Sequence, residues 1–316
     1  MYEVQTARGP VPTDQLGATL MHEHIFVRNA ELEENFPIAR WDEERAHETA
    51  VEGLNRLHDK GIRTIVDLTV MGLGRSIPRI QRIARAVDVN IVLATGYYTA
   101  RDLPGYFQHH GPGRLVDMQD PLEKTFLRDI QVGIGETDLR AGVIKVVTDE
   151  PGLTPDVQRV MRAAACAQME TGVPISTHTN AQARTGLLQQ EFFRQQGVDL
   201  TRVVIGHCGD TTDVDYLMEL MDNGSSIGLD RFGVDWVLPD DERIATAVRL
   251  CELGYADRIT LSHDAAFFLV NSPPRPRWTH FRISDEILPA LRTRGVSENT
   301  LQQIMVDNPA RILGAR

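Results

Sequence analysis

The chain has 316 residues, 42% of them hydrophobic and 24% charged, which is the composition of a folded protein with a large core rather than a disordered chain. Its formal net charge of -11, from 33 basic and 44 acidic residues, argues against nucleic-acid and anionic-membrane partners, because both bind concentrated positive charge. A small neutral substrate fits this charge better.

The sequence also predicts the cellular compartment. No apolar run approaches the roughly 18 residues of a membrane span, and the first residues lack the apolar stretch of a signal peptide. We therefore expect a cytoplasmic protein. The three cysteines, Cys166, Cys208 and Cys251, are an odd number without a paired framework, so we expect buried thiols in a reducing compartment.

Eight short apolar or β-branched runs alternate with longer segments whose apolar residues recur every three or four positions. In chain order the runs are 17–24, 62–69, 90–96, 142–149, 173–178, 202–207, 225–230 and 258–264. The clearest helical segments are 42–60, 154–171 and 240–253, and each is followed at once by a glycine: Gly61, Gly172 and Gly254.

This alternation predicts an α/β fold in which eight strands form a (β/α)8 TIM barrel. The first and last runs lie near the two ends of the chain, so closing the sheet would pair them and remove both edges. The alternative is an open doubly wound sheet, but no glycine-rich phosphate loop follows a strand. No linker or repeat divides the chain, so we expect a single domain over 1–316.

Polar residues occupy positions toward the ends of several predicted strands, where they are poor choices for a packed strand. Because the carboxyl ends of barrel strands converge on one face, these residues can meet there. A set of four imidazoles and one carboxylate suits zinc, cobalt, manganese or iron, although histidines at strand ends are often only hydrogen-bonded. The imidazoles are those of His22, His24, His178 and His207 and the carboxylate is that of Asp264, and Lys145 is the sixth polar residue of the group.

Lys145 lies within the predicted strand at 142–149. If its side chain points inward, burial and nearby cations favour the neutral amine, which can react with carbon dioxide to form a carbamate that bridges two metal ions. The alternative is an ordinary lysine that points outward to solvent.

Taken together, these residues resemble the phosphotriesterase-like lactonases, a branch of the amidohydrolase superfamily, along essentially the whole chain. The resemblance rests on LMHEH at 20–24, VIKVVTDEP at 143–151, ISTHT at 175–179, VIGHCGD at 204–210, LDRFG at 229–233, LSHD at 261–264 and NPAR at 308–311.

The resemblance implies a binuclear metal centre. His22, His24 and Asp264 would hold the more buried ion, and His178 and His207 the outer one, with carboxylated Lys145 and a hydroxide bridging the two. Asp264 would also accept a proton and later deliver it to the leaving alkoxide. The family resemblance further suggests a homodimer.

Two catalytic positions outside the ligand set follow from the same resemblance. Tyr98 corresponds to the tyrosine that orients the lactone, and Arg231 to the arginine that lines the pocket. Ordinary explanations stand beside these roles, since a tyrosine after a strand often only packs and Arg231 could pair with Asp230 or Asp235.

Two nearby residues complete the comparison with the family pattern. Asp210, three residues after His207, could orient an imidazole or the pocket arginine, or simply cap a loop. Asn180 stands where family members commonly have histidine, two residues after His178. Asn180 is not a ligand in the implied scheme, so the predicted metal centre is unaffected.

The apolar residues 265–270, followed by a proline-rich stretch to Trp278, predict a loop at the mouth of the barrel. This loop could line a channel for the acyl chain of an N-acyl homoserine lactone, or it could pack on the rim. We therefore expect a lactone hydrolase with weaker action on organophosphate triesters. The alternatives are a primary phosphotriesterase or other ester hydrolase, and a non-catalytic metal-binding or small-molecule-binding protein.

Overall fold

The computed structural model describes residues 2–36, 41–270, 272 and 275–314. Within these residues, nine strands form one sheet, in the order β10-β9-β8-β7-β6-β5-β4-β3-β11. The strands are β3 (Ala18–Val27), β4 (Ile62–Asp67), β5 (Asn90–Gly96), β6 (Val143–Thr148), β7 (Ile175–Thr179), β8 (Val203–Ile205), β9 (Ser226–Leu229), β10 (Ile259–Leu261) and β11 (Ala266–Leu269).

The sheet closes on itself. Neighbouring strands from β3 to β10 are all parallel, and the segment after β10 is joined to β3 by backbone hydrogen bonds. The Asp264 amide donates to the carbonyl of His22 at 3.0 Å, and the His24 amide donates to the carbonyl of Ala265 at 2.9 Å. The predicted (β/α)8 barrel is therefore confirmed, and the alternative of an open sheet is wrong.

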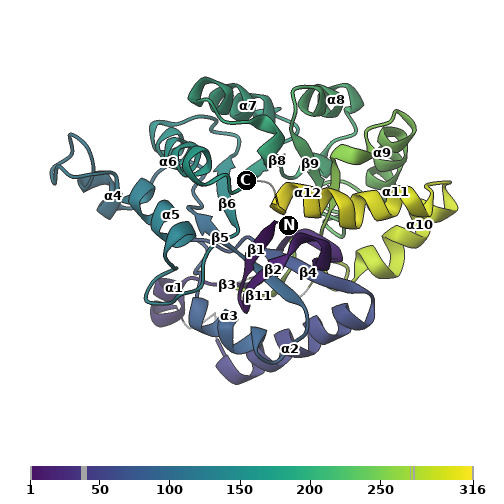
Figure 1. Ribbon diagram of the computed structural model, residues 1–316, viewed down its shortest axis with the longest axis horizontal. Helices are drawn as coiled ribbons and strands as arrows, with labels where there is room; N and C mark the ends of the chain where they lie inside the picture. The colour runs from purple at the N-terminus through teal and green to yellow at the C-terminus, as the bar shows by residue number, and fades with distance from the viewer. Residues whose placement is uncertain (1, 37–40, 271, 273–274, 315–316) are drawn as a thin grey trace.

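The helices form a ring around the strands (Figure 1). The three helices predicted most clearly are present as α2 (Glu43–Asp59), α6 (Pro155–Thr171) and α9 (Asp240–Glu252). The ring also contains α3 (Ile77–Ala84), α5 (Pro121–Gln131), α7 (Thr185–Gln196), α8 (Val214–Asp222), α10 (Leu288–Thr293), α11 (Glu298–Gln302) and α12 (Asn308–Gly314). Two further short helices, α1 (Ala30–Asn35) and α4 (Gly105–His109), lie in loops after β3 and β5.

Local signals explain where these helices begin and end. The Thr154 side chain accepts a hydrogen bond from the Val157 amide at the start of α6, and Gly172 ends that helix in the left-handed conformation with φ of 71°. Helix α2 begins after Asp42, whose carboxylate caps the Arg45 amide. Of these residues, the sequence prediction used only Gly172, as the glycine that follows the helical segment 154–171.

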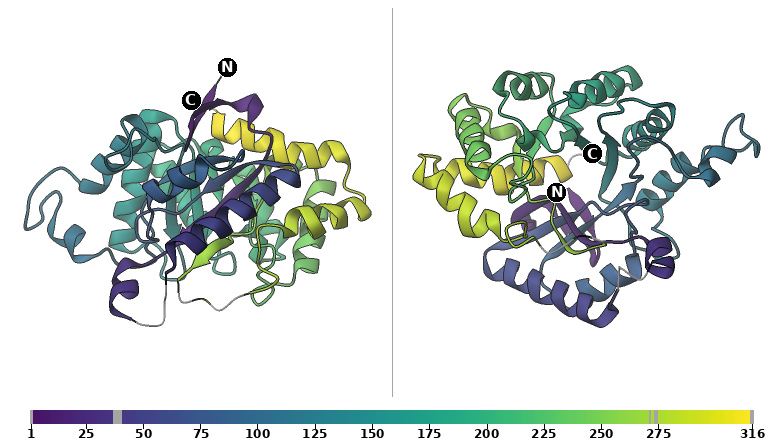
Figure 2. Two further views of the ribbon diagram at one scale, coloured as in Figure 1. Left: turned by 90° about the horizontal axis from the view of Figure 1, so that it is seen from below. Right: turned by 180° about the vertical axis from the view of Figure 1, so that it is seen from behind.

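A hairpin that the sequence analysis did not predict covers the N-terminal end of the barrel. It consists of β1 (Glu3–Thr6) and β2 (Gly9–Pro12), which pair antiparallel. Val4 of this hairpin and Leu313 of α12 belong to the core cluster that also contains Val66, Val92 and Val204 of the strands. Both chain termini lie at this end of the molecule (Figures 1 and 2), so the opposite end is left for the polar residues.

The apolar segment at 265–270 was predicted as a loop, but most of it is a strand. Residues Ala266–Leu269 form β11, which pairs with the last part of β3 and extends that strand to Val27. Phe267 stacks on His280 with ring centroids 4.0 Å apart, and Phe268 contacts Trp41 edge-on at 4.8 Å. The two phenylalanines therefore pack on the rim. Part of the proline-rich stretch, residues 271, 273 and 274, lies outside the described residues.

Other expectations can be compared with the structure directly. Among the described residues, no helix is both long enough and apolar enough to cross a membrane. All three cysteines are free thiols, but only Cys208 is fully buried, while Cys166 and Cys251 are partly exposed. The expectation that all three would be buried is therefore wrong for two of them, which lie on the outer helices α6 and α9.

Candidate metal centre

The side chains predicted as metal ligands all line one cavity of about 130 Å³ at the carboxyl ends of the strands. His22 and His24 lie on β3, and His178 lies on β7. His207 and Asp264 come shortly after β8 and β10, and Lys145 is the third residue of β6. The structure thus brings together all the residues that the sequence marked as ligands.

The carboxylate of Asp264 joins the two histidines of β3. Its Oδ1 atom lies 3.1 Å from His24 Nε2 and 3.4 Å from His22 Nε2. One ligand atom from each of these three residues lies within 4.8 Å of the other two, which is close enough for all three to bind one cation.

The remaining ligands lie beside this group. His207 Nε2 is 2.9 Å from His178 Nδ1 and 3.8 Å from Asp264 Oδ2, and Lys145 Nζ is 2.9 Å from His22 Nε2. Lys145 therefore points inward, as the carbamate hypothesis requires, and it is 1% exposed. The alternative of an outward-pointing lysine is wrong.

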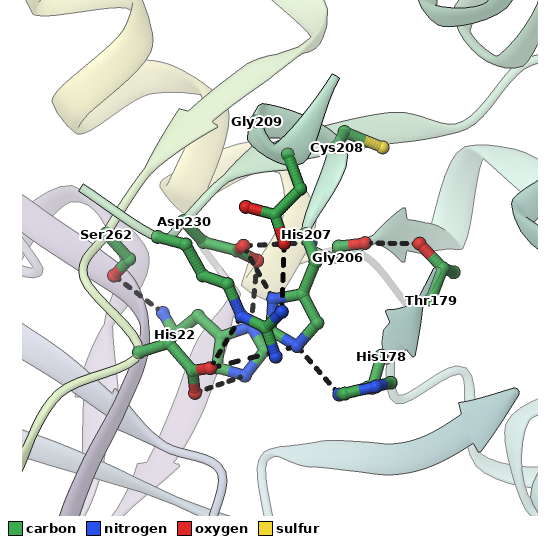
Figure 3. Close-up of polar contacts among 12 residues, drawn as sticks. His22, His178, Thr179, Gly206, His207, Cys208, Gly209, Asp230 and Ser262 are labelled. Atoms are coloured by element: carbon green, nitrogen blue, oxygen red, sulfur yellow. Dashed lines mark hydrogen bonds and ion pairs between the residues drawn. The ribbon is translucent and has the colours of Figure 1, made fainter. Parts of the chain in front are cut away.

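One buried carboxylate fixes two histidines whose rings stack with centroids 4.8 Å apart. Asp230 Oδ2 lies 2.8 Å from His22 Nδ1, while Asp230 Oδ1 lies 2.9 Å from His207 Nδ1 and accepts the His207 backbone amide at 2.8 Å (Figure 3). An ionised carboxylate can only accept, so both imidazoles carry hydrogen on Nδ1 and turn Nε2 toward the cavity. From the sequence, Asp230 was predicted only as a partner of Arg231.

The other two histidines are held in a similar way. His178 Nε2 lies 3.1 Å from Asp149 Oδ2, which leaves its Nδ1 facing the cavity, and His24 Nδ1 lies 2.9 Å from the Thr69 hydroxyl. Asn180 donates to Asp149 Oδ1 at 3.2 Å, so this departure from the family pattern supports the residue that orients His178 rather than acting as a ligand.

The protonation states also suit metal binding. Burial is the main cause that lowers the pKa of His22, His178 and His207, so these imidazoles are neutral and keep a free lone pair. Burial likewise lowers the pKa of Lys145 to about 8, despite the opposing charges of Asp264 and Asp230. Two divalent cations fit this set of groups, which consists of neutral imidazoles with one nitrogen already hydrogen-bonded, a carboxylate and a buried amine.

Replacing Asp230 with asparagine should weaken metal binding. The asparagine oxygen can keep the two bonds to His207, but its NH2 group would then face His22 Nδ1 and force hydrogen onto Nε2, which can no longer bind a cation. We expect a roughly 10- to 100-fold loss of metal affinity or turnover, measured by metal content after dialysis and by kinetics. A variant with two ions per chain and wild-type turnover would contradict this role.

Arg231 faces the cavity from the segment after β9. Its Nε atom donates to Asp264 Oδ2 at 3.1 Å and its Nη1 atom donates to Asp210 Oδ2 at 2.9 Å. Asp210 in turn accepts from the fully buried Arg243 at 2.8 Å. The arginine therefore pairs with these two carboxylates and not with Asp230 or Asp235, and Asp210 holds the arginine rather than capping a loop.

Tyr98 follows β5 and also lines the cavity. Its ring lies edge-on to His178, with centroids 5.7 Å apart. Burial raises the pKa of Tyr98 to about 12, so the hydroxyl keeps its proton and can donate a hydrogen bond. Five apolar residues also line the cavity: Val27, Leu73, Ala266, Leu269 and Trp278.

A histidine-rich cluster at the carboxyl ends of the strands of a (β/α)8 barrel is the arrangement of a metal-dependent hydrolase. Comparison with known families identifies which one. The model of the Phosphotriesterase family matches residues 2–313, and this chain belongs to that family. It is therefore an enzyme, and the family to which it belongs consists of binuclear metal hydrolases.

Individual relatives support the same assignment. A phosphotriesterase homology protein of Mycobacterium tuberculosis is 50% identical, over 99% of this chain and 98% of the relative. An aryldialkylphosphatase of Saccharolobus solfataricus is 39% identical, over 95% and 96%. The solved structure of the phosphotriesterase from Mycobacterium tuberculosis superimposes with a TM-score of 0.96, at 49% identity, covering 99% of this chain and 100% of that one.

A second solved structure was described as the engineering of organophosphate hydrolysis activity from a weak promiscuous lactonase template. It is 35% identical to this chain, with a TM-score of 0.91, and the match covers 99% of this chain and 100% of that one. The neighbours of this chain therefore include proteins described by each of the two activities that the sequence predicted.

Proposed function

We propose that the protein hydrolyses lactones, chiefly N-acyl homoserine lactones, and hydrolyses organophosphate triesters more weakly. The observation that carries the proposal is that apolar residues and the polar cluster line one and the same cavity. A lactone ring needs polar groups at its carbonyl, whereas an acyl chain needs an apolar surface a few atoms away. Val27, Leu73, Leu269 and Trp278 would provide that surface.

The four histidines, Asp264 and Lys145 would hold two divalent cations such as zinc, cobalt, manganese or iron, with Lys145 as a carbamate. Bound there, the cations would supply a water of lowered pKa and would polarise the lactone carbonyl. The inward position of Lys145 Nζ, 2.9 Å from His22 Nε2, supports a bridging role for its carbamate. Each histidine would present the nitrogen that its partner leaves free.

The residues of this chain would then handle the proton and the substrate. Asp264 would accept a proton from the attacking water and return it to the ring oxygen as the ring opens. Arg231 holds Asp264 Oδ2 at 3.1 Å, which keeps that carboxylate oriented while it exchanges the proton. Tyr98, with its protonated hydroxyl, would donate to the lactone and hold the carbonyl in place.

The proposal can be tested by preparing metal-free protein and reloading it with cobalt, manganese or zinc. Initial rates would be measured with an N-acyl homoserine lactone and with an aryl dialkyl phosphate triester. We expect the larger kcat/KM for the lactone. A larger value for the triester would make the protein a primary phosphotriesterase, as the name of the aryldialkylphosphatase relative suggests. No activity on either substrate with any metal would reject both functions.

Replacing Tyr98 with phenylalanine should lower kcat/KM for the lactone by about tenfold, the cost of one to two kcal/mol for a lost hydrogen bond in the site. Both metals should remain bound, because the tyrosine is not in the ligand set. Tyr106→Phe, on the exposed helix α4, is the matched control and should behave as wild type. Full lactone turnover by the Tyr98 variant would remove this residue from the site.

A further inference from the structure

A buried glutamate stands between the two histidines of β3 and takes no part in the cavity. Glu23 is 0% exposed, and alternation along the strand turns its side chain away from the face that carries His22 and His24. A carboxylate in such a position is costly unless its oxygens are fully bonded. The bonds that Glu23 makes therefore indicate what it does.

The hydrogen bonds of its side chain reach the turn that follows β10, and outside this turn His280 Nε2 lies 3.7 Å from Glu23 Oε2. Glu23 Oε1 accepts from the Ser262 hydroxyl at 3.1 Å, from the His263 amide at 3.0 Å and lies 2.6 Å from His263 Nδ1. Glu23 Oε2 accepts from the Ala265 amide at 3.1 Å. The two backbone amides that the carboxylate holds are those on either side of Asp264.

Asp264 itself has an unusual backbone. Its φ is 56°, in the left-handed region that residues other than glycine rarely adopt. A conformation of this kind persists only where the surroundings impose it. Part of the constraint is the bond from the Asp264 amide to the His22 carbonyl, and part is the bond from the His22 amide to Ser262 Oγ at 2.8 Å.

We infer that Glu23 is a positioning residue, which holds this turn so that the Asp264 carboxylate faces His22, His24 and Arg231. The inference rests on the proposed function, because it gives Asp264 its place in the metal centre. Glu23 would act through Asp264 and would touch neither the substrate nor a cation.

The environment of His263 shows why the carboxylate cannot easily be replaced. His263 Nε2 accepts the Ile283 amide at 2.9 Å, so the ring carries its hydrogen on Nδ1 and donates it to Glu23 Oε1. A glutamine at position 23 would keep its single oxygen toward the three donors of Ser262 and His263. Its NH2 group would then face the amide of Ala265, and the far side of the turn would lose its acceptor.

The test compares Glu23→Gln with Asp129→Asn, in protein loaded with cobalt. Asp129 is an equally buried carboxylate, bonded to Thr95 and Arg75 outside the barrel, so its variant controls for the loss of a buried charge. The readouts are cobalt content per chain, the visible absorption spectrum of bound cobalt, a crystal structure of the turn, the melting temperature, and kcat and KM for a lactone.

For Glu23→Gln we expect a displaced Asp264 carboxylate, an altered cobalt spectrum and a kcat reduced by about tenfold or more, with KM little changed. For Asp129→Asn we expect a lower melting temperature with the wild-type spectrum and kcat. A Glu23→Gln protein with the wild-type turn, spectrum and kcat would overturn the inference. So would a loss of kcat that accompanies an unaltered turn and spectrum.

If Glu23→Gln does not fold, Ser262→Ala provides the test, because it removes only the hydroxyl that links the His22 amide to Glu23 Oε1. A smaller change in the same readouts is expected, and wild-type values throughout would overturn the inference. Failure of the proposed function is seen separately: wild-type protein would then bind cobalt without opening lactones, while the turn and the spectrum would still report on Glu23.

Discussion

Lys145→Ala should lose most of its bound metal and nearly all lactone turnover. Lys145 is the only side chain of β6 among the residues that line the cavity, and its amine lies 2.9 Å from the ligand nitrogen of His22. Alanine leaves no group to neutralise and connect two cations. The expected loss exceeds the roughly 10- to 100-fold cost of removing a residue that only orients a ligand. Metal analysis of dialysed protein and initial rates with a lactone measure it.

The same variant tests the carbamate, because the cavity left by the lysine side chain can admit a small carboxylic acid. Acetate or propionate should restore part of the metal content and part of the turnover of Lys145→Ala. Lys124→Ala, on the exposed side of α5, is the control. It should bind metal normally, and the added acid should change neither its metal content nor its turnover. Unchanged metal content in Lys145→Ala would count against a bridging lysine.

Asp264→Asn should reduce kcat by about 100- to 10,000-fold, the range for loss of a general acid–base group. Asparagine has almost the same volume, but it has no charge and cannot take up a proton. Asp264 also lies within 3.4 Å of two histidine nitrogens, so metal affinity should fall as well. Rates are therefore measured at saturating cobalt, which separates lost occupancy from lost proton transfer.

Asp241→Asn, an exposed carboxylate on α9 paired with Arg294, is the matched control and should keep wild-type rates. If Asp264→Asn reached the wild-type kcat at full metal occupancy, Asp264 would have no part in proton transfer. A normal kcat reached only at much higher metal concentration would assign it to metal binding alone.

The eight strands of the barrel could be predicted because a strand buried on both faces is a continuous apolar run. The structure shortens several of them, such as β8 at Val203–Ile205 against the predicted 202–207, since the last residues leave the sheet to form the site. The strands β1, β2 and β11 were missed. Each has only four residues, and their half-exposed patterns do not differ from those of loops.

The metal ligands could be predicted from the sequence, but the residues that orient them could not. His22 and His178 stand out because an imidazole at the end of an apolar run is conspicuous. The partners that orient them are not conspicuous. Asp149 and Asp230 directly follow their strands, as an aspartate at the start of any loop does. Their roles depend on which strands lie close together: Asp230, after β9, bonds to His22 on β3, which is two strands along the closed barrel and 208 positions away. Sequence spacing contains no information about such a pair.

Part of the apolar lining of the cavity comes from connections between elements. Leu73 and Trp278 lie in such connections, whereas Val27, Ala266 and Leu269 lie on strands. Connections tolerate replacement far better than barrel strands do. Substitutions at these apolar positions could therefore redirect the enzyme to longer, shorter or non-lactone substrates while its chemical apparatus stays in place, which would allow one scaffold to diversify without first losing its catalytic power.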